Sequence, residues 1–382
     1  MGDADHEAFF AELGAFGPVL LEGLEGLEWA QRWLHPPMIG QLQQQLRPLI
    51  PQLDTAWARF QAVKPPQGLA GLRDDLGAGV EPLMKALRLF ADDSDAFDPG
   101  AESIARVLGS MKAHCRALEA LFPLRLALPP LSRFFVEAPF RRDLEALDPE
   151  PPEGLPVGLL RGRGAGPGAE NEGGELRGGF SLYVPESYDG SQPWPLVVAL
   201  HGGSGEGRDF IWTWLREARG RRFLLLAPTS RGPTWSLMGA DVDAPALRNM
   251  VAAVMERFSV DAKRVLLTGL SDGATYSLLA GLQEDMPFTA LAPLSGVLHP
   301  MNYANGNMER AAGMRIHLTH GALDWMFPVD VARVAAAELE KAGAEIEYHE
   351  IEDLSHTYAR EENDRILSWF DPSLALPEPS TL

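Results

Sequence analysis

From residue 193 onward, short apolar runs alternate with longer segments that have helical spacing. The runs are "PLVVAL", "FLLLAP", "RVLLTG", "TALAPL" and "RIHLTH", and the intervening segments include "APALRNMVAAVMERF" and "VDVARVAAAELEKAG". A nearly continuous apolar run indicates a strand buried on both faces, as in a parallel sheet covered by helices. A last strand, "AEIEYHEI", precedes a closing helix, "AREENDRILSWF". The sequence therefore predicts an α/β domain over residues 179–382.

Residues 1–148 have a different texture. Leu, Phe, Trp and Met recur every three or four positions, and prolines punctuate the pattern, which predicts an irregular bundle of about five or six helices. Residues 149–178 are rich in Pro and Gly and mark the predicted domain boundary. Within them "LPVGLLRG" is a candidate strand that pairs with "GGFSLYVPESY" across a mobile Gly-rich loop; a disordered linker is the alternative.

Composition excludes several classes of function. The 382 residues carry a formal charge of −20, which repels nucleic acid and anionic lipid surfaces. Cys115 is the single cysteine, so neither an intrachain disulfide nor a cysteine metal cluster can form. The start is acidic, and no apolar run reaches the roughly 18 residues that span a bilayer. We expect a cytoplasmic protein with no membrane insertion.

The stretch "VLLTGLSDGATYSLLAGL" contains a Gly-x-Ser-x-Gly pattern at Gly269–Gly273. A strand comes directly before it and a helix directly after it, as in a nucleophile elbow, where a serine occupies a strained turn between small neighbours. This context favours Ser271 as a nucleophile. The alternative is a glycine-bounded turn with an ordinary surface serine.

A serine nucleophile needs a base and a group that orients the base. His356 follows the last strand, and Asp324 follows "RIHLTH", so the order serine, acid, histidine is that of the elbow fold. Asp330 is the rival acid, although its position suits the start of a helix better. Of the other histidines, we expect packing or hydrogen-bonding roles for His317, His320 and His349, and His6, His35 and His114 show no partner pattern.

Two backbone N–H groups must bind the oxyanion of the tetrahedral intermediate. One is expected from Asp272, directly after the nucleophile. The other is expected from the loop "HGGSGEG", with Gly203 ahead of Gly202 and Ser204. A phosphate-binding turn is the alternative for this loop, but it matches neither Gly-x-Gly-x-x-Gly nor the Walker A pattern.

The blocks "LYVPESY", "LVVALHGGSG", "LAPTSRGPTW", "LLTGLSDGA", "HGALDWMFPV" and "DLSHTY" occur in order over about residues 179–370. In these blocks the chain resembles bacterial phospholipase/carboxylesterase and polyhydroxybutyrate-depolymerase-like serine esterases of the α/β-hydrolase superfamily. The resemblance implies a mostly parallel sheet of about eight strands, the triad Ser271, Asp324 and His356, the oxyanion hole of Gly203 and Asp272, no metal or cofactor, and small-molecule ester substrates. It does not extend to the helical region.

Side chains on loops after the strands are the candidate substrate contacts, and aromatic and methionine residues there favour apolar or aryl groups. The candidates are Trp212, Trp235, Met238, His299, Tyr303, Trp325, Met326 and Phe327. A thioesterase, lysophospholipase or peptidase would use the same triad, and a non-catalytic hydrolase fold is a further alternative. We expect the helical domain to roof the active site or to form a homo-oligomer interface.

Overall fold

The computed structural model describes residues 3–91, 101–150, 152–162 and 177–377. The chain divides into two compact units, Met1–Phe135 and Val136–Leu382. The division lies earlier in the chain than the predicted boundary at residue 148. An α-helical unit therefore precedes an α/β unit, as predicted, but residues 136–148 belong to the α/β unit.

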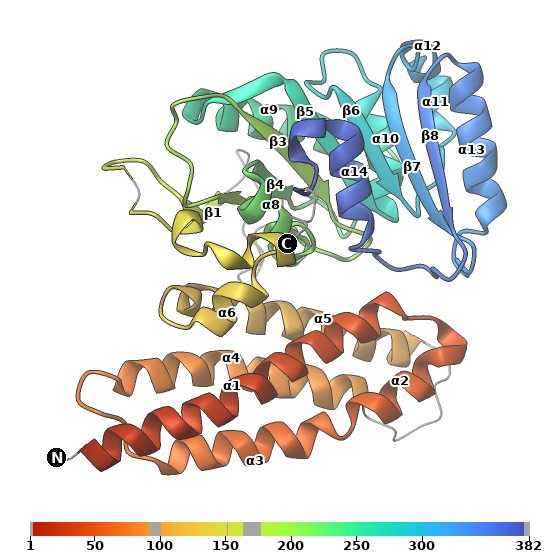
Figure 1. The fold of residues 1–382 in the computed structure, drawn as a ribbon. Coiled ribbons are helices and arrows are strands. Elements are labelled where there is room, and N and C mark those ends of the chain that lie inside the picture. Colours follow the sequence, from red (N-terminus) through yellow and green to blue (C-terminus); the bar gives the residue numbers. More distant parts are fainter. Residues whose placement is uncertain (1–2, 92–100, 151, 163–176, 378–382) are drawn as a thin grey trace. The chain divides into compact units, whose positions relative to one another are not determined.

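The first unit is a helical bundle (Figure 1). Leu20, Leu24 and Leu27 recur at helical spacing on one face of the first helix, and all three are buried. An aromatic cluster closes the bundle where Phe16 stacks on Phe60, with ring centroids 5.6 Å apart. The helices are α1 (Asp3–Arg32), α2 (Ile39–Leu46), α3 (Leu49–Ala62), α4 (Ala70–Ala91), α5 (Ala101–Leu121) and α6 (Pro129–Phe134), with 3₁₀ turns η1 (Pro36–Met38) and η2 (Phe122–Leu126).

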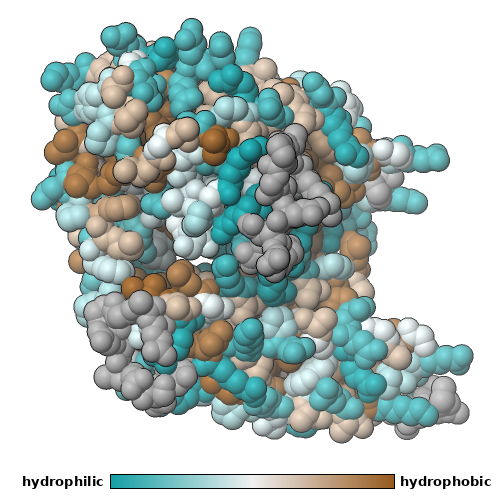
Figure 2. All heavy atoms as spheres, turned by 180° about the vertical axis from the view of Figure 1, so that it is seen from behind, coloured by the Kyte–Doolittle hydropathy of each residue, from teal (hydrophilic) through white to brown (hydrophobic). Residues whose placement is uncertain are grey.

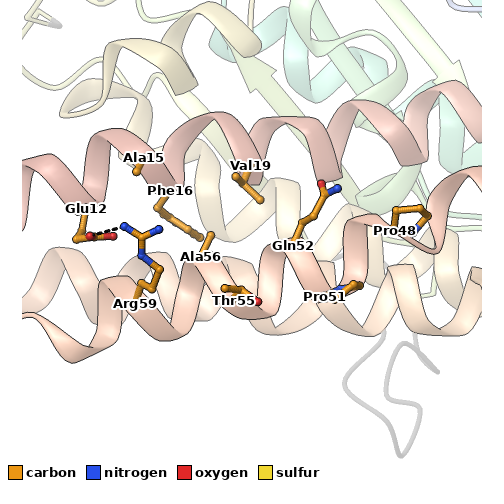
Figure 3. A pocket seen from close by; sticks show the side chains of 10 residues that line it. All are labelled: Glu12, Ala15, Phe16, Val19, Pro48, Pro51, Gln52, Thr55, Ala56 and Arg59. Atoms are coloured by element: carbon orange, nitrogen blue, oxygen red, sulfur yellow. Dashed lines mark hydrogen bonds and ion pairs between the residues drawn. The ribbon is translucent and has the colours of Figure 1, made fainter.

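A shallow groove of about 630 Å³ runs between α1 and α3 (Figure 3). Phe16 and Val19 line it from α1, and Pro51 and Ala56 line it from α3. Arg59 closes one end of the groove by pairing with Glu12 at 2.7 Å. The groove is thus mostly apolar, with a single ion pair across it.

The second unit is built on an eight-stranded sheet in the order β1-β2-β4-β3-β5-β6-β7-β8. β1 and β2 are antiparallel to their neighbours, and the remaining pairs are parallel. Every residue of β3, β4 and β6 is buried, which explains their continuous apolar sequences. The strands are β1 (Gly158–Gly162), β2 (Phe180–Val184), β3 (Trp194–Leu200), β4 (Leu224–Pro228), β5 (Val260–Leu270), β6 (Ala290–Leu294), β7 (Arg315–Gly321) and β8 (Glu345–Ile351).

Helices cover both faces of this sheet. α9, α10 and α13 share one core cluster with the sheet, and α14 lies on the opposite face, in front of the sheet in Figure 1. The predicted mostly parallel sheet with helices on both faces is confirmed. The helices are α7 (Gly207–Phe210), α8 (Leu215–Arg221), α9 (Asp243–Arg257), α10 (Asp272–Gly281), α11 (Met301–Ala304), α12 (Asn307–Arg310), α13 (Val329–Lys341) and α14 (Glu362–Phe370), with 3₁₀ turns η3 (Ala138–Arg142), η4 (Glu145–Leu147), η5 (Ile211–Thr213) and η6 (Pro372–Leu374).

The candidate hairpin in the linker is present as a strand pair. β1 pairs with β2 in antiparallel register, with Leu160 opposite Leu182. The Gly-rich loop that was expected to join them, residues 163–176, lies outside the described residues. The first strand of the sheet is thus contributed by a segment whose composition predicted a linker.

Two buried arginines explain why residues 136–148 belong to the second unit. Arg219 and Arg221 lie in α8, and their side chains are 0% and 1% exposed. Arg219 pairs with Asp148, and Arg221 pairs with Glu137. A buried guanidinium needs such partners because an unpaired charge in the interior is costly. Sequence spacing gives no sign of these long-range pairs.

The surface of the second unit carries exposed apolar side chains along α11 and α13. Tyr303, Val331 and Val334 line a shallow groove of about 370 Å³ there. Figure 2 shows hydrophobic atoms gathered on that side of the unit. In the described part of the chain, no helix combines the length and the hydropathy that crossing a membrane requires.

The Glu137 and Arg221 pair generates a test of this assignment. Replacing Glu137 by Gln removes one of the two carboxylates that pair with the buried guanidinium of Arg221 and leaves Asp364 as the other, so we expect the second unit to lose about 2 kcal/mol of stability. Hydrogen exchange of peptides from β3 to β5, measured in the whole chain, reports this loss. Glu284→Gln, at an exposed pair with Arg310, is the control and should leave exchange unchanged. Unchanged exchange in Glu137→Gln would contradict the assignment.

Candidate active site

Ser271 lies between the end of β5 and the start of α10, at the carboxyl edge of the sheet. Its backbone has φ 58° and ψ −119°, a conformation that costs a residue with a side chain about 1–3 kcal/mol. The Ser271 N–H donates to the carbonyl of Leu294, at the end of β6, at 3.0 Å. The neighbouring strand thus holds the strained turn in place.

Small residues on either side of Ser271 allow the sharp turn. A Cβ on Gly273 would lie 2.4 Å from the carbonyl oxygen of Leu200, and a Cβ on Gly269 would lie 2.6 Å from the backbone of Gly273. Real Cβ atoms do not approach backbone this closely, so α10 can meet β3 only through glycine. The local geometry of an elbow, which the Gly-x-Ser-x-Gly spacing predicts, is therefore present.

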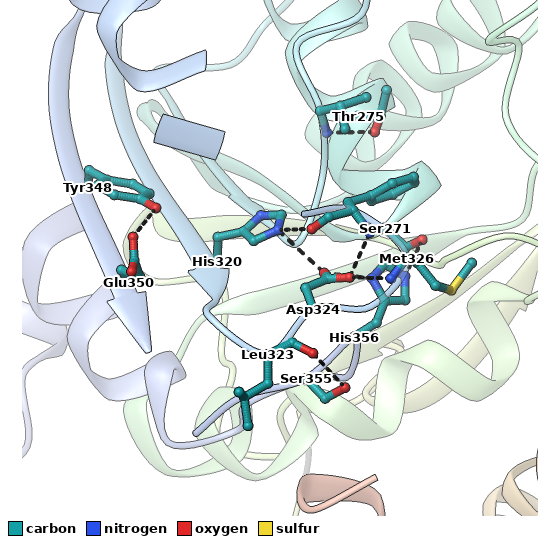
Figure 4. A network of polar contacts seen from close by, with 12 residues as sticks. Ser271, Thr275, His320, Leu323, Asp324, Met326, Tyr348, Glu350, Ser355 and His356 are labelled. Carbon is teal, nitrogen blue, oxygen red and sulfur yellow. Dashed lines mark hydrogen bonds and ion pairs between the residues drawn. The ribbon is translucent and has the colours of Figure 1, made fainter. Parts of the chain in front are cut away.

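The imidazole of His356 lies between Ser271 and Asp324 (Figure 4). His356 Nε2 is 2.8 Å from Ser271 Oγ, and His356 Nδ1 is 2.8 Å from Asp324 Oδ2. The side chains of Asp324 and His356 are 0% and 9% exposed. The structure thus brings together three side chains that are distant in sequence: Asp324 is 53 positions after Ser271, and His356 is 32 positions after Asp324.

Backbone contacts hold the loop of Asp324 against the loop of His356. The N–H of Ala322 donates to the carbonyl of Ile351 at 2.8 Å, and the N–H of Leu323 donates to that of Leu354 at 2.9 Å. A Cβ on Gly321 would lie 2.2 Å from the Leu354 carbonyl oxygen, so glycine is needed for this approach. The Ser355 hydroxyl adds a hydrogen bond to the Leu323 carbonyl at 3.3 Å. The two loops therefore place acid and imidazole as one unit.

Asp324 is buried, yet its environment favours the carboxylate. Burial alone would raise the pKa of Asp324, but the hydrogen bond from His356 and the N–H of Phe327 outweigh burial, so the pKa is lowered. Asp324 Oδ1 accepts from the N–H groups of Met326 and Phe327 at 2.9 and 2.8 Å. The rival acid, Asp330, is exposed and pairs with Arg333 instead.

These contacts fix the tautomer of His356. An ionised carboxylate only accepts hydrogen bonds, so Nδ1 of His356 carries the proton that faces Asp324. In the neutral ring Nε2 is then an acceptor, and the hydroxyl of Ser271 donates to it. The arrangement can therefore remove a proton from Ser271.

The loop after β3 places its glycines beside Ser271. A Cβ on Gly202 would lie 3.5 Å from Ser271 Cβ. His201 stabilises this turn, because its Nδ1 contacts the Gly202 carbonyl at 2.7 Å and its Nε2 accepts a hydrogen bond from the N–H of Ser230. The N–H of Ser204 donates to the carbonyl of Pro233, so Gly202 and Gly203 remain as the candidate oxyanion donors of this loop.

Asp272 has a neighbour that the sequence did not indicate. The hydroxyl of Thr234 donates to Asp272 Oδ2 at 2.6 Å, and a Cβ on Gly203 would lie 2.8 Å from the same oxygen. The two expected oxyanion residues are thus adjacent. As the first residue of α10, Asp272 has a backbone N–H without an acceptor inside the helix.

Residues 239–371, about a third of the chain, match the model of the phospholipase/carboxylesterase family. This match spans α9 to α14 and includes Ser271, Asp324 and His356. Over these residues the second unit is similar to phospholipase/carboxylesterase proteins.

One similar protein is an esterase by name. A probable feruloyl esterase C from Aspergillus terreus (strain NIH 2624 / FGSC A1156) is 25% identical over 158 residues, which cover 40% of this chain and 56% of the relative. The chain thus spans little more than half the length of this relative.

Two solved structures are also similar to part of this chain. The acetyl xylan esterase from Aspergillus awamori is 18% identical, with a TM-score of 0.42, over 50% of this chain and 93% of that chain. Esterase 2 from Thermogutta terrifontis, phosphorylated by paraoxon, is 16% identical, with a TM-score of 0.42, over 52% of this chain and 91% of that chain.

The candidate substrate contacts of the second unit differ in burial. Trp325 and Met326, directly after Asp324, are 47% and 50% exposed. His299 is half-buried, and Met238 and Tyr303 are exposed. The ring of Phe327 packs edge-on against His356, with centroids 5.2 Å apart. Phe327 therefore supports the imidazole directly.

Two tryptophans that were expected to contact substrate are buried instead. The Trp235 indole N–H donates to the His201 carbonyl at 2.8 Å, and the ring stacks on Tyr276. Trp212 is 4% exposed, in η5. Their positions favour packing over substrate contact, because a loop residue near a strand end can point inward as readily as toward a ligand.

Among the other histidines of the second unit, His317 and His349 have packing and hydrogen-bonding environments, as expected. Burial lowers the pKa of His317 to about 4, and His349 Nδ1 contacts Glu362 at 2.7 Å. His320 differs, because its Nε2 lies 3.4 Å from Asp324 Oδ2. The sequence could have indicated this contact, because His320 stands four residues before Asp324, near the end of β7. In the described ranges, no cluster of three or more His, Cys, Asp or Glu side chains is arranged to hold a metal ion.

The backbone of Ser271 predicts a stability difference between two variants that lack the hydroxyl. Ser271→Gly and Ser271→Ala both remove the hydroxyl, but only glycine adopts positive φ without steric cost. We expect Ser271→Gly to be more stable than Ser271→Ala by about 1 kcal/mol in chemical denaturation. Equal stabilities, or a more stable alanine variant, would show that the turn is not strained.

The lowered pKa of Asp324 predicts how stability depends on pH. A carboxyl group whose pKa is lower in the folded state contributes stability above its unfolded pKa and loses it as the pH falls through the folded pKa. Asp324→Asn should therefore be less stable than the parent at pH 7, and the gap should narrow below about pH 4. Asp330→Asn is the control. A gap that widens on acidification in thermal denaturation would argue against an ionised Asp324.

Proposed function

We propose that this protein is a serine carboxylesterase that works through a Ser271, His356 and Asp324 triad and an acyl-enzyme. The supporting observation is that His356 contacts both Ser271 Oγ and Asp324 Oδ2 at 2.8 Å. Serine, imidazole and carboxylate in this order activate a hydroxyl that is otherwise a weak nucleophile. The family match over residues 239–371 supports the same class of reaction.

In the acylation step, Ser271 Oγ bonds to the ester carbonyl carbon while His356 Nε2 takes the hydroxyl proton. The carbonyl oxygen becomes an oxyanion, and His356 becomes a cation that faces the Asp324 carboxylate. His356 then gives its proton to the alcohol oxygen as the ester C–O bond breaks. Alcohol leaves, and the acyl group remains on Ser271.

In the deacylation step, water repeats the sequence. His356 takes a proton from water, and the water oxygen bonds to the acyl carbon. The proton returns to Ser271 Oγ as the bond from Oγ to the acyl carbon breaks, which releases the carboxylic acid. Both steps develop an oxyanion, which the N–H groups of Gly203 and Asp272 would hold.

The same site favours neutral substrates that carry apolar or aryl groups. Trp325 and Met326 expose apolar surface directly beside Asp324. The Asp272 carboxylate adjoins Gly203, and the chain carries a net charge of −20, so an anionic acyl group would be repelled. Aryl esters, including the feruloyl esters that the name of the Aspergillus terreus relative implies, are the first substrates to test.

Substitution of the triad tests the proposal by hydrolysis of p-nitrophenyl acetate. Ser271→Ala should lower kcat by about 10⁴- to 10⁶-fold, and Asp324→Asn by about 10²- to 10⁴-fold, with folding retained. Ser191→Ala, at an exposed serine, and Asp330→Asn are matched controls that should keep the parent rate. A Ser271→Ala protein with parent activity would refute the assignment. Mass spectrometry of the parent after fluorophosphonate treatment should place the adduct on Ser271.

A further inference from the structure

His320 is a fully buried side chain next to the triad, and the proposed mechanism gives it no role. It lies near the end of β7, and its side chain is 0% exposed. Its Nε2 faces two oxygens, the Phe327 carbonyl at 2.8 Å and Asp324 Oδ2 at 3.4 Å (Figure 4). Asp324 Oδ2 is also the oxygen that contacts His356 Nδ1.

The contacts of His320 define its protonation at one atom. A carbonyl oxygen and an ionised carboxylate oxygen both only accept hydrogen bonds, so Nε2 of His320 must carry a proton. The main hydrogen bond goes to the Phe327 carbonyl, and the same N–H points partial positive charge at Asp324. His320 is therefore a donor in the pair of loops that carries the acid.

The hydrogen bond from His320 closes a ring of contacts around Phe327. The Phe327 N–H donates to Asp324 Oδ1 at 2.8 Å, and its carbonyl accepts from His320. With the backbone held on both sides, the Phe327 ring lies edge-on against the imidazole of His356, at 88° between the ring planes. One side chain thus constrains two groups that contact the base, the Asp324 carboxylate and the Phe327 ring.

The other charged groups near His320 already have partners. Glu350 of β8 lies directly opposite His320 in the strand register. Its carboxylate accepts from Arg333 at 2.6 and 2.8 Å and from the Tyr348 hydroxyl at 2.9 Å. Arg333 also pairs with Asp330. His320 makes its 3.4 Å carboxylate contact with Asp324.

We propose that His320 is a positioning residue for the reaction, which holds the loop of Asp324 and Phe327 so that His356 stays aligned with Ser271. The inference rests on the proposed esterase function and deepens it. His320 does not touch the reacting atoms and acts only through Asp324 and Phe327. Its loss should therefore change the rate of the chemical step and the basicity of His356, and should leave substrate binding nearly unchanged.

Two neutral, polar replacements separate this role from simple packing. In His320→Gln the side-chain amide reaches the place of Nε2 and can still donate, whereas in His320→Asn it reaches only the place of Nδ1. We expect His320→Asn to lower kcat for p-nitrophenyl acetate by about 10- to 100-fold, with KM within about twofold of the parent. His320→Gln should stay within about threefold of the parent in both constants.

The pH profile gives a readout that packing alone would not move. Without the N–H of residue 320, less positive charge faces the Asp324 carboxylate. Its negative charge then attracts the His356 cation more strongly. The acid limb of kcat/KM, which reports the free base, should therefore move to higher pH in His320→Asn and return in His320→Gln. Identical kcat values and identical acid limbs in the parent and both variants would overturn the proposal.

Phe327→Leu keeps both backbone hydrogen bonds and removes only the ring, so the test does not depend on the folding of His320→Asn. We expect its kcat to fall by about five- to tenfold, with the acid limb unmoved. Parent kcat in this variant would overturn the part of the proposal that acts through the ring.

The parent and Ser271→Ala are assayed alongside these variants. An inactive parent, or an active Ser271→Ala, refutes the esterase function itself. An active parent with unaffected His320 variants refutes only this inference.

Discussion

The strained backbone of Ser271 is the constraint on which the site depends. A positive φ at a residue with a side chain is unfavourable by itself, and it persists because two neighbouring strands fix its surroundings. β6 accepts the Ser271 N–H, and β3 meets α10 at a distance that only Gly273 permits. The buried strands of the parallel sheet stabilise this turn, and the turn presents the serine hydroxyl at the edge where the loops after β7 and β8 meet.

The second constraint is electrostatic. Asp324 is a buried carboxylate in a chain with net charge −20, and it is kept ionised by donors that converge on it. Two backbone N–H groups and His356 supply hydrogen bonds, and His320 adds a polar N–H at longer range. A carboxylate satisfied in this way is less free to move than an exposed one. Asp330, by contrast, is exposed and paired with Arg333.

Much of the fold could be predicted from the sequence because its signals are local. Strands such as β3 and β4 are buried on both faces and read as apolar runs, and the glycines around Ser271 report a turn that needs them. The order of Ser271, Asp324 and His356 could be predicted because each follows a strand of a parallel sheet, and such strand ends share one edge. The observed contacts of His356 with Ser271 and Asp324 agree with this expectation.

The features that sequence reasoning missed all depend on where side chains point. Trp235 was grouped with Trp325 because both lie on loops near strand ends, yet Trp235 stacks on Tyr276 in the interior and Trp325 is half exposed. The boundary moved from residue 148 to 135 because Glu137 and Asp148 pair with arginines more than 70 positions away. No periodicity reports such pairs, since they are chosen by packing in three dimensions.

The position of the loop from Gly321 to Phe327 depends both on its local sequence and on long-range contacts. Its sequence indicates an acid after a strand. The hydrogen bonds that position this acid join the loop to β7 at His320 and to the loop of His356 at Leu354. Because the acid, the aromatic support and the imidazole share these anchors, a displacement of one displaces the others. The alignment of His356 with Ser271 is therefore a property of the whole pair of loops, and neither loop alone is sufficient to set it.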